Sequence, residues 1–219
     1  MFLYYITDRT QFSGDESHRR QKLLAKISEA AACGVDFIQV REKDLSAGEL
    51  EGLAKEVLEA VHNRHLNRGT PATRLLINSR SDIALAVGAD GVHLRSRDIC
   101  IRDAQKAGEI VFSRNPELAG GKWMVASSCH SEEEVRAAAE QGADFVVFAP
   151  VFEKKEGSSP SGLDALRSAC RHPVPVLALG GVTLENAQSC LDAGAAGVAG
   201  IRLFQDHEIS EVVRVIRAA

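Results

Sequence analysis

The sequence predicts an α/β fold, a (β/α)8 TIM barrel built as a single domain over residues 1–219. Four related pieces carry this prediction, because they recur at nearly equal intervals of 54, 54 and 52 residues. Each follows an alanine-rich helical segment and precedes an apolar run, as expected where a glycine ends a helix before a buried parallel strand. An interval of about 54 residues suits two βα units of roughly 25–30 residues, so four intervals predict eight strands. The pieces begin at Gly34, Gly88, Gly142 and Gly194.

Eight short apolar runs mark the expected strands. Helical stretches such as His18–Ala32 and Ser46–Arg64 separate them, and this alternation predicts a parallel sheet with helices outside it. Periodicity alone also permits an open doubly wound sheet, but even spacing along the whole chain favours a closed barrel. No linker-like or low-complexity segment interrupts the pattern, which predicts one domain. The expected strands are Phe2–Thr7, Phe37–Arg41, Arg74–Ile77, Gly91–Leu94, Trp123–Ala126, Phe145–Phe148, Val174–Ala178 and Gly197–Ile201.

The first strand and the least regular stretches orient this barrel. The apolar N-terminal run is followed at once by Thr7, Asp8 and Arg9. It is therefore too short for a signal peptide or a membrane span, and we expect a buried strand. Residues 67–73 and 113–122 precede strands and belong to the bottom of the barrel. Residues 153–161 follow the sixth strand and belong to the top, where barrel enzymes hold their active sites.

Charge and cysteine content exclude several classes of protein. The formal net charge is −4, and the charged residues are interspersed. This predicts no nucleic-acid partner and no membrane partner, so an anionic ligand must be bound by local features. The five cysteines form no C-x-x-C pair and have no zinc-like spacing with the seven histidines. Reduced thiols and a cytoplasmic location are therefore expected.

A glycine pair after the seventh expected strand indicates a phosphate site. Gly180 and Gly181 begin the segment that runs to Asn186, and residues without side chains let backbone N–H groups approach a phosphate closely. Barrels often bind phosphate with the loops after strands seven and eight. The simpler interpretation is a tight turn followed by a helix cap at Thr183 or its neighbour, which is compatible with phosphate binding.

Cationic side chains alternate at the end of the second expected strand. Gln39, Arg41 and Lys43 point to the same side, which in a closed barrel is the interior or the mouth. Buried charge needs a partner, either a ligand anion or an ion-pair network with Asp44 and Asp98. We favour the ligand.

Carboxylates and histidines near the strand ends allow further chemistry. Asp98, with Asp8 and Asp44, is the only sign of a Mg2+ site, although Asp98 equally suits the N-cap of a helix beginning near Ile99. His93 is expected to fill the barrel interior. His130 follows the fifth strand beside Ser128, where it could transfer protons. Cys129 has no evident activating base and is expected to be inert.

Six pieces in order along nearly the whole chain resemble the family of thiamine phosphate synthase and the related thiazole tautomerase of thiamine biosynthesis. They are Tyr5–Arg9, Ile38–Asp44, Leu76–Arg80, Asp82–Leu85, Gly88–Leu94 and Leu177–Val182.

The synthase resemblance implies that the diphosphate of a hydroxymethylpyrimidine leaves with Mg2+ assistance and that the nitrogen of a thiazole phosphate attacks the resulting cation. It places small phosphorylated substrates and a Mg2+ ligated by Asp98 in the mouth, and suggests a homodimer. The candidate catalytic residues are Arg41, Lys43, Ser128 and His130. The candidate substrate-binding residues are Gln39, Asn78, Ser79, Lys154, Gly180, Gly181, Ile201 and Arg202.

Several positions depart from the synthase pattern. Ser79 stands where synthases carry an aspartate, so one expected metal carboxylate is absent. Arg95 and Ser96 replace Gly-Gln, Arg97 replaces an acidic residue, and Arg202 replaces a serine. The tautomerase, in which His130 would move a proton without a metal, and a non-catalytic phosphate-binding paralogue are therefore the alternatives.

Overall fold

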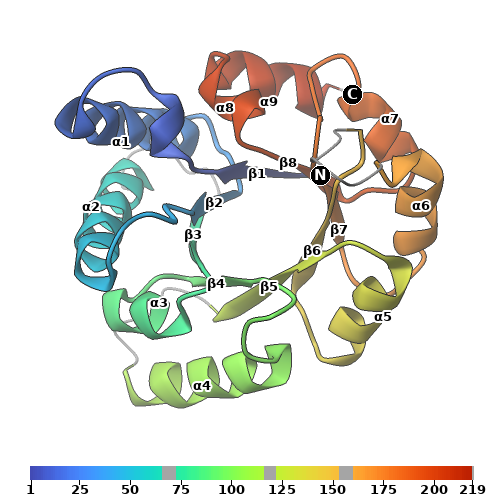
Figure 1. The fold of residues 1–219 in the computed structure, drawn as a ribbon, viewed down its shortest axis with the longest axis horizontal. Coiled ribbons are helices and arrows are strands. Elements are labelled where there is room, and N and C mark those ends of the chain that lie inside the picture. Colours follow the sequence, from blue (N-terminus) through green and yellow to red (C-terminus); the bar gives the residue numbers. More distant parts are fainter. Residues whose placement is uncertain (66–72, 116–121, 153–159, 219) are drawn as a thin grey trace.

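Eight parallel strands form a closed barrel in which each strand pairs with the next and β8 pairs with β1 (Figure 1). The computed structural model describes residues 1–65, 73–115, 122–152 and 160–218. The predicted (β/α)8 barrel is therefore confirmed, and the open sheet is excluded. The strands are β1 Phe2–Ile6, β2 Phe37–Val40, β3 Arg74–Asn78, β4 Gly91–Leu94, β5 Met124–Cys129, β6 Phe145–Phe148, β7 Val176–Ala178 and β8 Gly197–Gly200.

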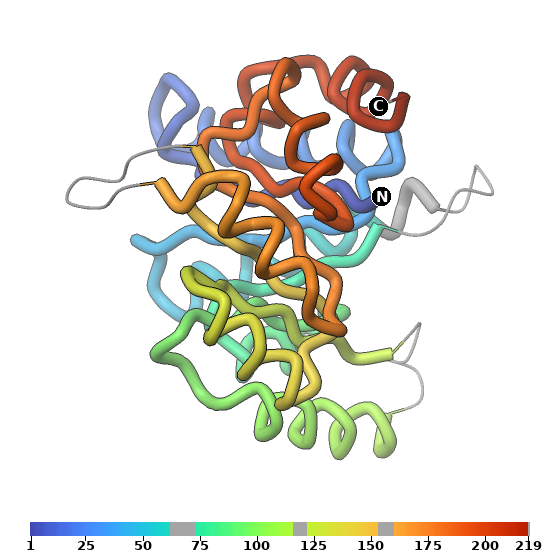
Figure 2. The backbone as a smooth tube through the Cα atoms, turned by 90° about the vertical axis from the view of Figure 1, so that its right-hand side faces the viewer, coloured from blue at the N-terminus to red at the C-terminus, as the bar shows by residue number. Residues whose placement is uncertain are grey.

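Helices surround the strands, as Figures 1 and 2 show from two directions. Helices expected over His18–Ala32 and Ser46–Arg64 are present with slightly shifted ends. None of the described helices is long and apolar enough to cross a membrane. The helices are α1 Glu16–Ala32, α2 Ala47–His65, α3 Ser81–Val87, α4 Ile101–Arg114, α5 Glu132–Glu140, α6 Gly162–Ala169, α7 Ala187–Asp192, α8 Arg202–Gln205 and α9 Ile209–Arg217, with a 3-10 turn η1 at Arg9–Gln11.

The core has two parts, because successive strand residues face opposite sides of the sheet. Tyr5 packs outward against the helices, whereas Tyr4 points into the barrel. Inside, the Phe37 and Phe145 rings stack with centroids 4.8 Å apart, and Tyr4 meets Phe145 edge-on at 5.3 Å. These rings fill the barrel interior, so the space for a ligand lies at the C-terminal ends of the strands.

Two strands, β5 and β7, differ from the sequence prediction by two or more residues at one end, and four others differ by a single residue. β5 continues to Cys129, because Ser127 and Ser128 pair with Val146 and Val147 of β6. β7 begins at Val176, two residues later than predicted. The preceding Pro175 has no N–H to donate to a sheet, and its carbonyl accepts from Val146.

The start of α4 settles one alternative for Asp98. This helix begins at Ile101 with Cys100 at the N-cap position. Asp98 therefore does not cap it, and the N-cap interpretation is wrong.

Of the candidate site residues, Lys154 lies outside the described residues.

Candidate functional site

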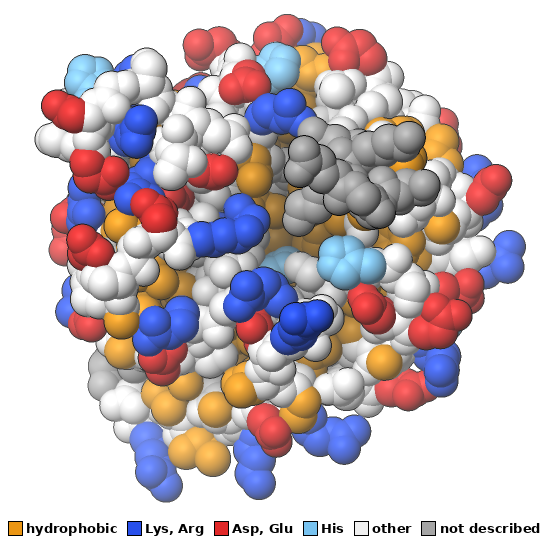
Figure 3. Space-filling model, in the orientation of Figure 1, with side chains coloured by type: hydrophobic (Ala, Val, Ile, Leu, Met, Phe, Trp, Pro, Cys, Tyr) orange, Lys and Arg blue, Asp and Glu red, His pale blue; other side chains and the backbone are white. Residues whose placement is uncertain are grey.

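A cavity of about 530 Å³ opens at the C-terminal ends of the strands. We call it the mouth cavity. On the face viewed in Figure 3, Lys and Arg side chains gather beside the central hollow. The structure therefore brings together most of the residues that the sequence singled out. The cavity is lined by Ile6, Gln39, Arg41, Lys43, Asn78, His93, Arg95, Ser96, Arg97, Asp98, Ser128, His130, Ala149, Pro150, Leu179, Gly180 and Ile201.

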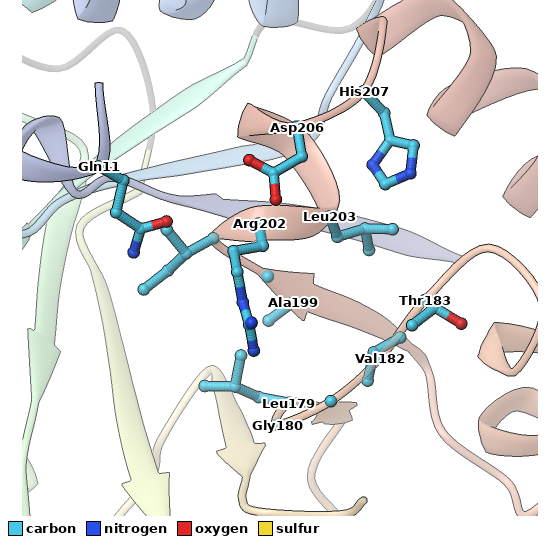
Figure 4. Close-up of a pocket in the computed structure, with 13 residues that line it drawn as sticks. Gln11, Leu179, Gly180, Val182, Thr183, Ala199, Arg202, Leu203, Asp206 and His207 are labelled. Atoms are coloured by element: carbon cyan, nitrogen blue, oxygen red, sulfur yellow. The ribbon is translucent and has the colours of Figure 1, made fainter. Parts of the chain in front are cut away.

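A second cavity, of about 660 Å³, lies over the ends of β7 and β8 (Figure 4). We call it the glycine cavity. Figure 4 shows Arg202 extending from the start of α8 toward Leu179 and Gly180. The two cavities share Leu179, Gly180 and Ile201, so they adjoin along one seam. The glycine cavity is lined by Gln11, Leu179, Gly180, Gly181, Val182, Thr183, Ala199, Gly200, Ile201, Arg202, Leu203, Asp206 and His207.

The loop after β7 requires glycine at the seam. Gly180 and Gly181 have φ of 96° and 70°, a region that residues with side chains rarely adopt. A Cβ at Gly180 would lie 2.7 Å from Cα of Pro150. Asn186 holds the turn, since its Oδ1 accepts from Thr183 N–H at 2.8 Å and its Nδ2 donates to the Gly181 carbonyl at 2.9 Å. The loop is thus a fixed turn with an open backbone, as a phosphate site needs.

The end of β2 presents Arg41 to the mouth cavity. The Arg41 N–H donates to Thr7 Oγ1 at 3.0 Å, which ties it to the end of β1. Burial lowers the pKa of the guanidinium, and its side chain pairs with no carboxylate among the described residues. Beneath it, the buried Gln39 donates from Nε2 to Asn78 Oδ1 at 3.1 Å. Arg41 therefore presents a partly buried cation to the mouth cavity.

Arg9, just after β1, lines neither cavity. It is 3% exposed. Its Nη1 donates to Glu42 at 3.1 Å, and the guanidinium makes two 2.8 Å bonds to Asp44. These bonds, led by those to Asp44, raise the pKa of Arg9 and lower that of Asp44. Asp44 therefore belongs to a structural network with Arg9.

Arg95 and Asp98 form a pair in the loop after β4. Asp98 Oδ2 accepts from the Arg95 N–H at 2.8 Å, and Oδ1 accepts from Nη2 at 3.1 Å. Burial of Asp98 opposes ionisation, but hydrogen bonds from Arg95 and Ser79 prevail and lower the pKa of this carboxyl. Arg95 and Arg97 both face the mouth cavity, a direction that the sequence could not decide.

The described donors at the mouth do not match a protein-held Mg2+. Such an ion is usually bound through one or two carboxylates in addition to phosphate oxygens and water. Asp98 is the only carboxylate among the described residues that line the cavity, and both of its oxygens bond to Arg95. Over the described residues, no three His, Cys, Asp or Glu side chains group as metal ligands.

Ser79 supports the loop after β4. Its N–H donates to the His93 carbonyl at 2.8 Å, and its side chain hydrogen-bonds to Asp98. Ser79 has φ of 62°, the only positive φ among the described residues other than glycine. It therefore sits beside the cavity as a support and does not line it.

His93 links the barrel interior to the mouth. Its Nδ1 lies 3.1 Å from Tyr4 Oη, and its Nε2 lies 2.7 Å from Ser128 Oγ. Burial, and then Arg41, lower the His93 pKa to about 3, so the ring is neutral at physiological pH. The sequence predicted an interior His93 but missed its hydrogen bonds to Tyr4 and Ser128. The signal that could have revealed them is that Tyr4 and His93 both point inward.

His130 and Cys129 are neighbours in the sequence but differ in their exposure. His130 is exposed at the cavity edge, and its Nδ1 lies 2.7 Å from the Ala149 carbonyl. A carbonyl only accepts, so Nδ1 carries a proton and the ring is oriented. Cys129 is buried, which raises its pKa to about 12. It does not line the mouth cavity, consistent with an inert thiol.

The comparisons with known proteins agree with this geometry. A model of the family described as thiamine monophosphate synthase matches residues 3–204. A Geobacter sulfurreducens protein, whose name assigns it provisionally as a thiamine-phosphate synthase, is 40% identical over 99% of this chain and 92% of its own length. The thiamine-phosphate synthase of Chloroflexus aurantiacus is 33% identical, over 99% and 91%.

A solved structure extends the likeness to three dimensions. The thiamine phosphate pyrophosphorylase of Pyrococcus furiosus superposes with a TM-score of 0.78 at 26% identity, covering 99% of this chain and 94% of its own. The matched family residues contain the end of every strand that builds the two cavities. The chain therefore belongs to the thiamine monophosphate synthase family.

Proposed function

We propose that this chain is a thiamine-phosphate synthase, a transferase of thiamine biosynthesis. It joins hydroxymethylpyrimidine diphosphate to thiazole phosphate and releases diphosphate. The observation that carries the proposal is the pair of adjoining cavities, one cationic and one built on glycine backbone, which meet at Gly180. Two anionic substrates that must react with each other need two such neighbouring sites. The family and the names of the relatives support the same reaction.

The mouth cavity accepts the pyrimidine diphosphate. Arg41 and Lys43 bind the diphosphate, because guanidinium and ammonium groups pair with phosphate oxygens. Polar groups face the pyrimidine from Gln39 and Asn78, which hydrogen-bond to each other. A further polar group comes from Ser128, which His93 orients.

The chemical step needs no protein nucleophile. The C–O bond between the pyrimidine methylene and diphosphate breaks, and its electron pair leaves with the diphosphate. The nitrogen lone pair of the thiazole then forms the new C–N bond. Cations fixed beside the leaving group stabilise the charge that develops on it.

The glycine cavity accepts the thiazole phosphate. Backbone groups at Gly180, Gly181 and Ile201 surround the phosphate, and Arg202 covers it. Lys154, which lies outside the described residues, keeps its predicted role as a substrate-binding residue. This arrangement directs the thiazole nitrogen across the seam toward the mouth cavity.

Ser79 and His130 keep narrower roles in this proposal. Ser79 holds Asp98 and the loop after β4, and so acts on substrate through them. His130 is oriented by Ala149 at the edge of the mouth cavity, where it contacts the pyrimidine. The tautomerase alternative is not needed, because two relatives similar to this chain are named as thiamine-phosphate synthases.

Mg2+ ligated by Asp98 stays a prediction of the resemblance. The family chemistry would use it to assist diphosphate departure, but the described donors do not form a site for it, and no step above depends on it. A homodimer, a single domain over residues 1–219 and a cytoplasmic location complete the proposal.

The test is direct. Purified protein incubated with hydroxymethylpyrimidine diphosphate and thiazole phosphate is expected to form thiamine phosphate and diphosphate in equal amounts. Arg41→Gln should lower kcat about 100-fold, the effect of losing one preorganised charge at a developing anion. Arg136→Gln is the matched control, because Arg136 is exposed on α5 and pairs with Glu140. No product from wild-type protein would refute the synthase.

A further inference from the structure

The charge at the mouth cavity is strongly unbalanced among the described residues. Arg41, Lys43, Arg95 and Arg97 line it, against the single carboxylate of Asp98. That carboxylate is already neutralised by Arg95 at 3.1 Å. A divalent cation entering here would meet four cationic side chains and a carboxylate already bonded to Arg95, whereas a diphosphate would meet a net positive charge.

Arg95 is a mouth cation whose side chain stays accessible to a ligand. Its side chain is 56% exposed, although its backbone is held by Asp98 at 2.8 Å. The guanidinium can therefore turn into the cavity while the loop stays in place. Arg41 and Arg95 line the same cavity. The charge of Arg95 also lowers the pKa of Arg41, although burial contributes more and Asp8 and Glu42 act in the opposite direction. Both guanidinium groups therefore face an anion that enters this cavity.

We propose that Arg95, together with Arg41, takes the place of a divalent metal in stabilising the departing diphosphate, so that release of diphosphate does not require Mg2+. The inference rests on the proposed function. Planar guanidinium groups bind phosphate oxygens in pairs, and arginines stabilise transferring phosphates in other enzymes. As the C–O bond breaks, the electron pair moves to the diphosphate oxygen, and the positive charges of Arg41 and Arg95 offset the negative charge that develops there.

Asp98 has a different part in this arrangement from that of a metal ligand. It pairs with Arg95 through both oxygens and is itself held by Ser79. Asp98 is thus a positioning residue, which keeps the Arg95 loop ordered before the substrate arrives. The absence of a carboxylate at Ser79 fits this role, since a second acid there would compete for the guanidinium.

The first experiment measures binding of inorganic diphosphate by calorimetry, in EDTA and in Mg2+. Wild-type protein is expected to bind diphosphate in EDTA with an affinity within about threefold of that in Mg2+. Arg95→Gln should weaken binding in EDTA at least tenfold, and Arg95→Lys should recover part of it. Arg136→Gln, in an exposed Arg–Glu pair of the same 3.1 Å separation, should bind as wild type. Circular dichroism checks that each variant is folded.

The second experiment follows thiamine phosphate formation under the same conditions. Wild-type activity should persist in EDTA, and Arg95→Gln should lower kcat at least tenfold in EDTA. Added Mg2+ should restore part of that loss, because the variant leaves Asp98 without its cation.

The outcomes separate the two proposals. Diphosphate binding or turnover that appears only with Mg2+, or an Arg95→Gln variant that binds diphosphate as wild type does, would overturn the role of Arg95. If no condition yields thiamine phosphate, yet diphosphate binds in EDTA and Arg95→Gln loses that binding, the synthase fails. The arginine site for diphosphate then stands.

Discussion

The imidazole of His93 lies where a charged ring would be costly. It is 3% exposed, between Tyr4 and Ser128, and Arg41 adds a repulsive charge. A neutral ring at this point keeps Ser128 oriented without adding to the positive charge of the mouth. His93 therefore has two roles, because it fills the barrel interior and orients Ser128 at the mouth cavity.

This burial predicts how stability depends on pH. The His93 pKa falls from 6.5 to about 3 on folding, so the unfolded chain binds more protons between these values. The free energy of unfolding should then decrease as pH drops through that window, by at most about 1.4 kcal/mol per pH unit from this group. Urea unfolding at pH 7, 6, 5 and 4 measures it.

His93→Gln should flatten that dependence, because glutamine keeps polar atoms in place but does not titrate. His18→Gln, at an exposed position of α1, is the control and should retain the wild-type slope. Equal slopes for wild type and His93→Gln would contradict the assignment of the effect to this ring.

At the scale of elements, the ends of β1 and β2 are joined by one buried network. Arg9, in η1, bonds to Glu42 and Asp44 beyond β2, and Thr7 bonds to Glu42 at 2.5 Å. The same hydroxyl accepts the Arg41 N–H. The network therefore fixes the segment that carries Arg41 and Lys43 into the mouth cavity.

Removing the cation of this network should be costly. Arg9→Met leaves Glu42, whose side chain is 1% exposed, without its cationic partner, and breaking such a buried pair typically costs about 3 kcal/mol. Urea unfolding should show that loss at pH 7. Arg20→Met removes the half-exposed pair with Glu56 and should cost less than about 1 kcal/mol. A loss for Arg9→Met as small as that of the control would show that the network contributes little.

At the scale of the whole molecule, ligand binding should stabilise the barrel as one unit. Thiazole phosphate at about 100 times its Kd adds roughly 2.7 kcal/mol and should raise Tm by about 5–10 °C. Arg202→Gln should reduce that shift by at least half, measured against the variant's own Tm in the absence of ligand. Differential scanning fluorimetry measures both values. A full shift in Arg202→Gln would remove Arg202 from the phosphate site.

The barrel was predictable because its repeat is visible in the sequence. Details of the site depend on contacts between residues that are far apart in the sequence. The Gly34, Gly88, Gly142 and Gly194 pieces mark helix-to-strand corners that recur whatever the function. The burial of Arg9 depends on carboxylates 33 and 35 positions away, which no local pattern reveals. The polar Ser127 and Ser128 resembled a loop, and only pairing with β6 extends the strand through them.

The left-handed backbone at Ser79 places a metal-dependent version of this site one mutation away. Asp and Asn adopt a φ near 62° more readily than Ser does, so Ser79→Asp would not strain the fold. It would set a second carboxylate beside Asp98, to which Ser79 already bonds. Calorimetry should detect Mg2+ binding to this variant and none to wild type, and Mg2+ binding to both would argue against this account. Evolution can thus exchange a guanidinium for a metal ion by one substitution, because the main chain at position 79 accommodates either serine or aspartate.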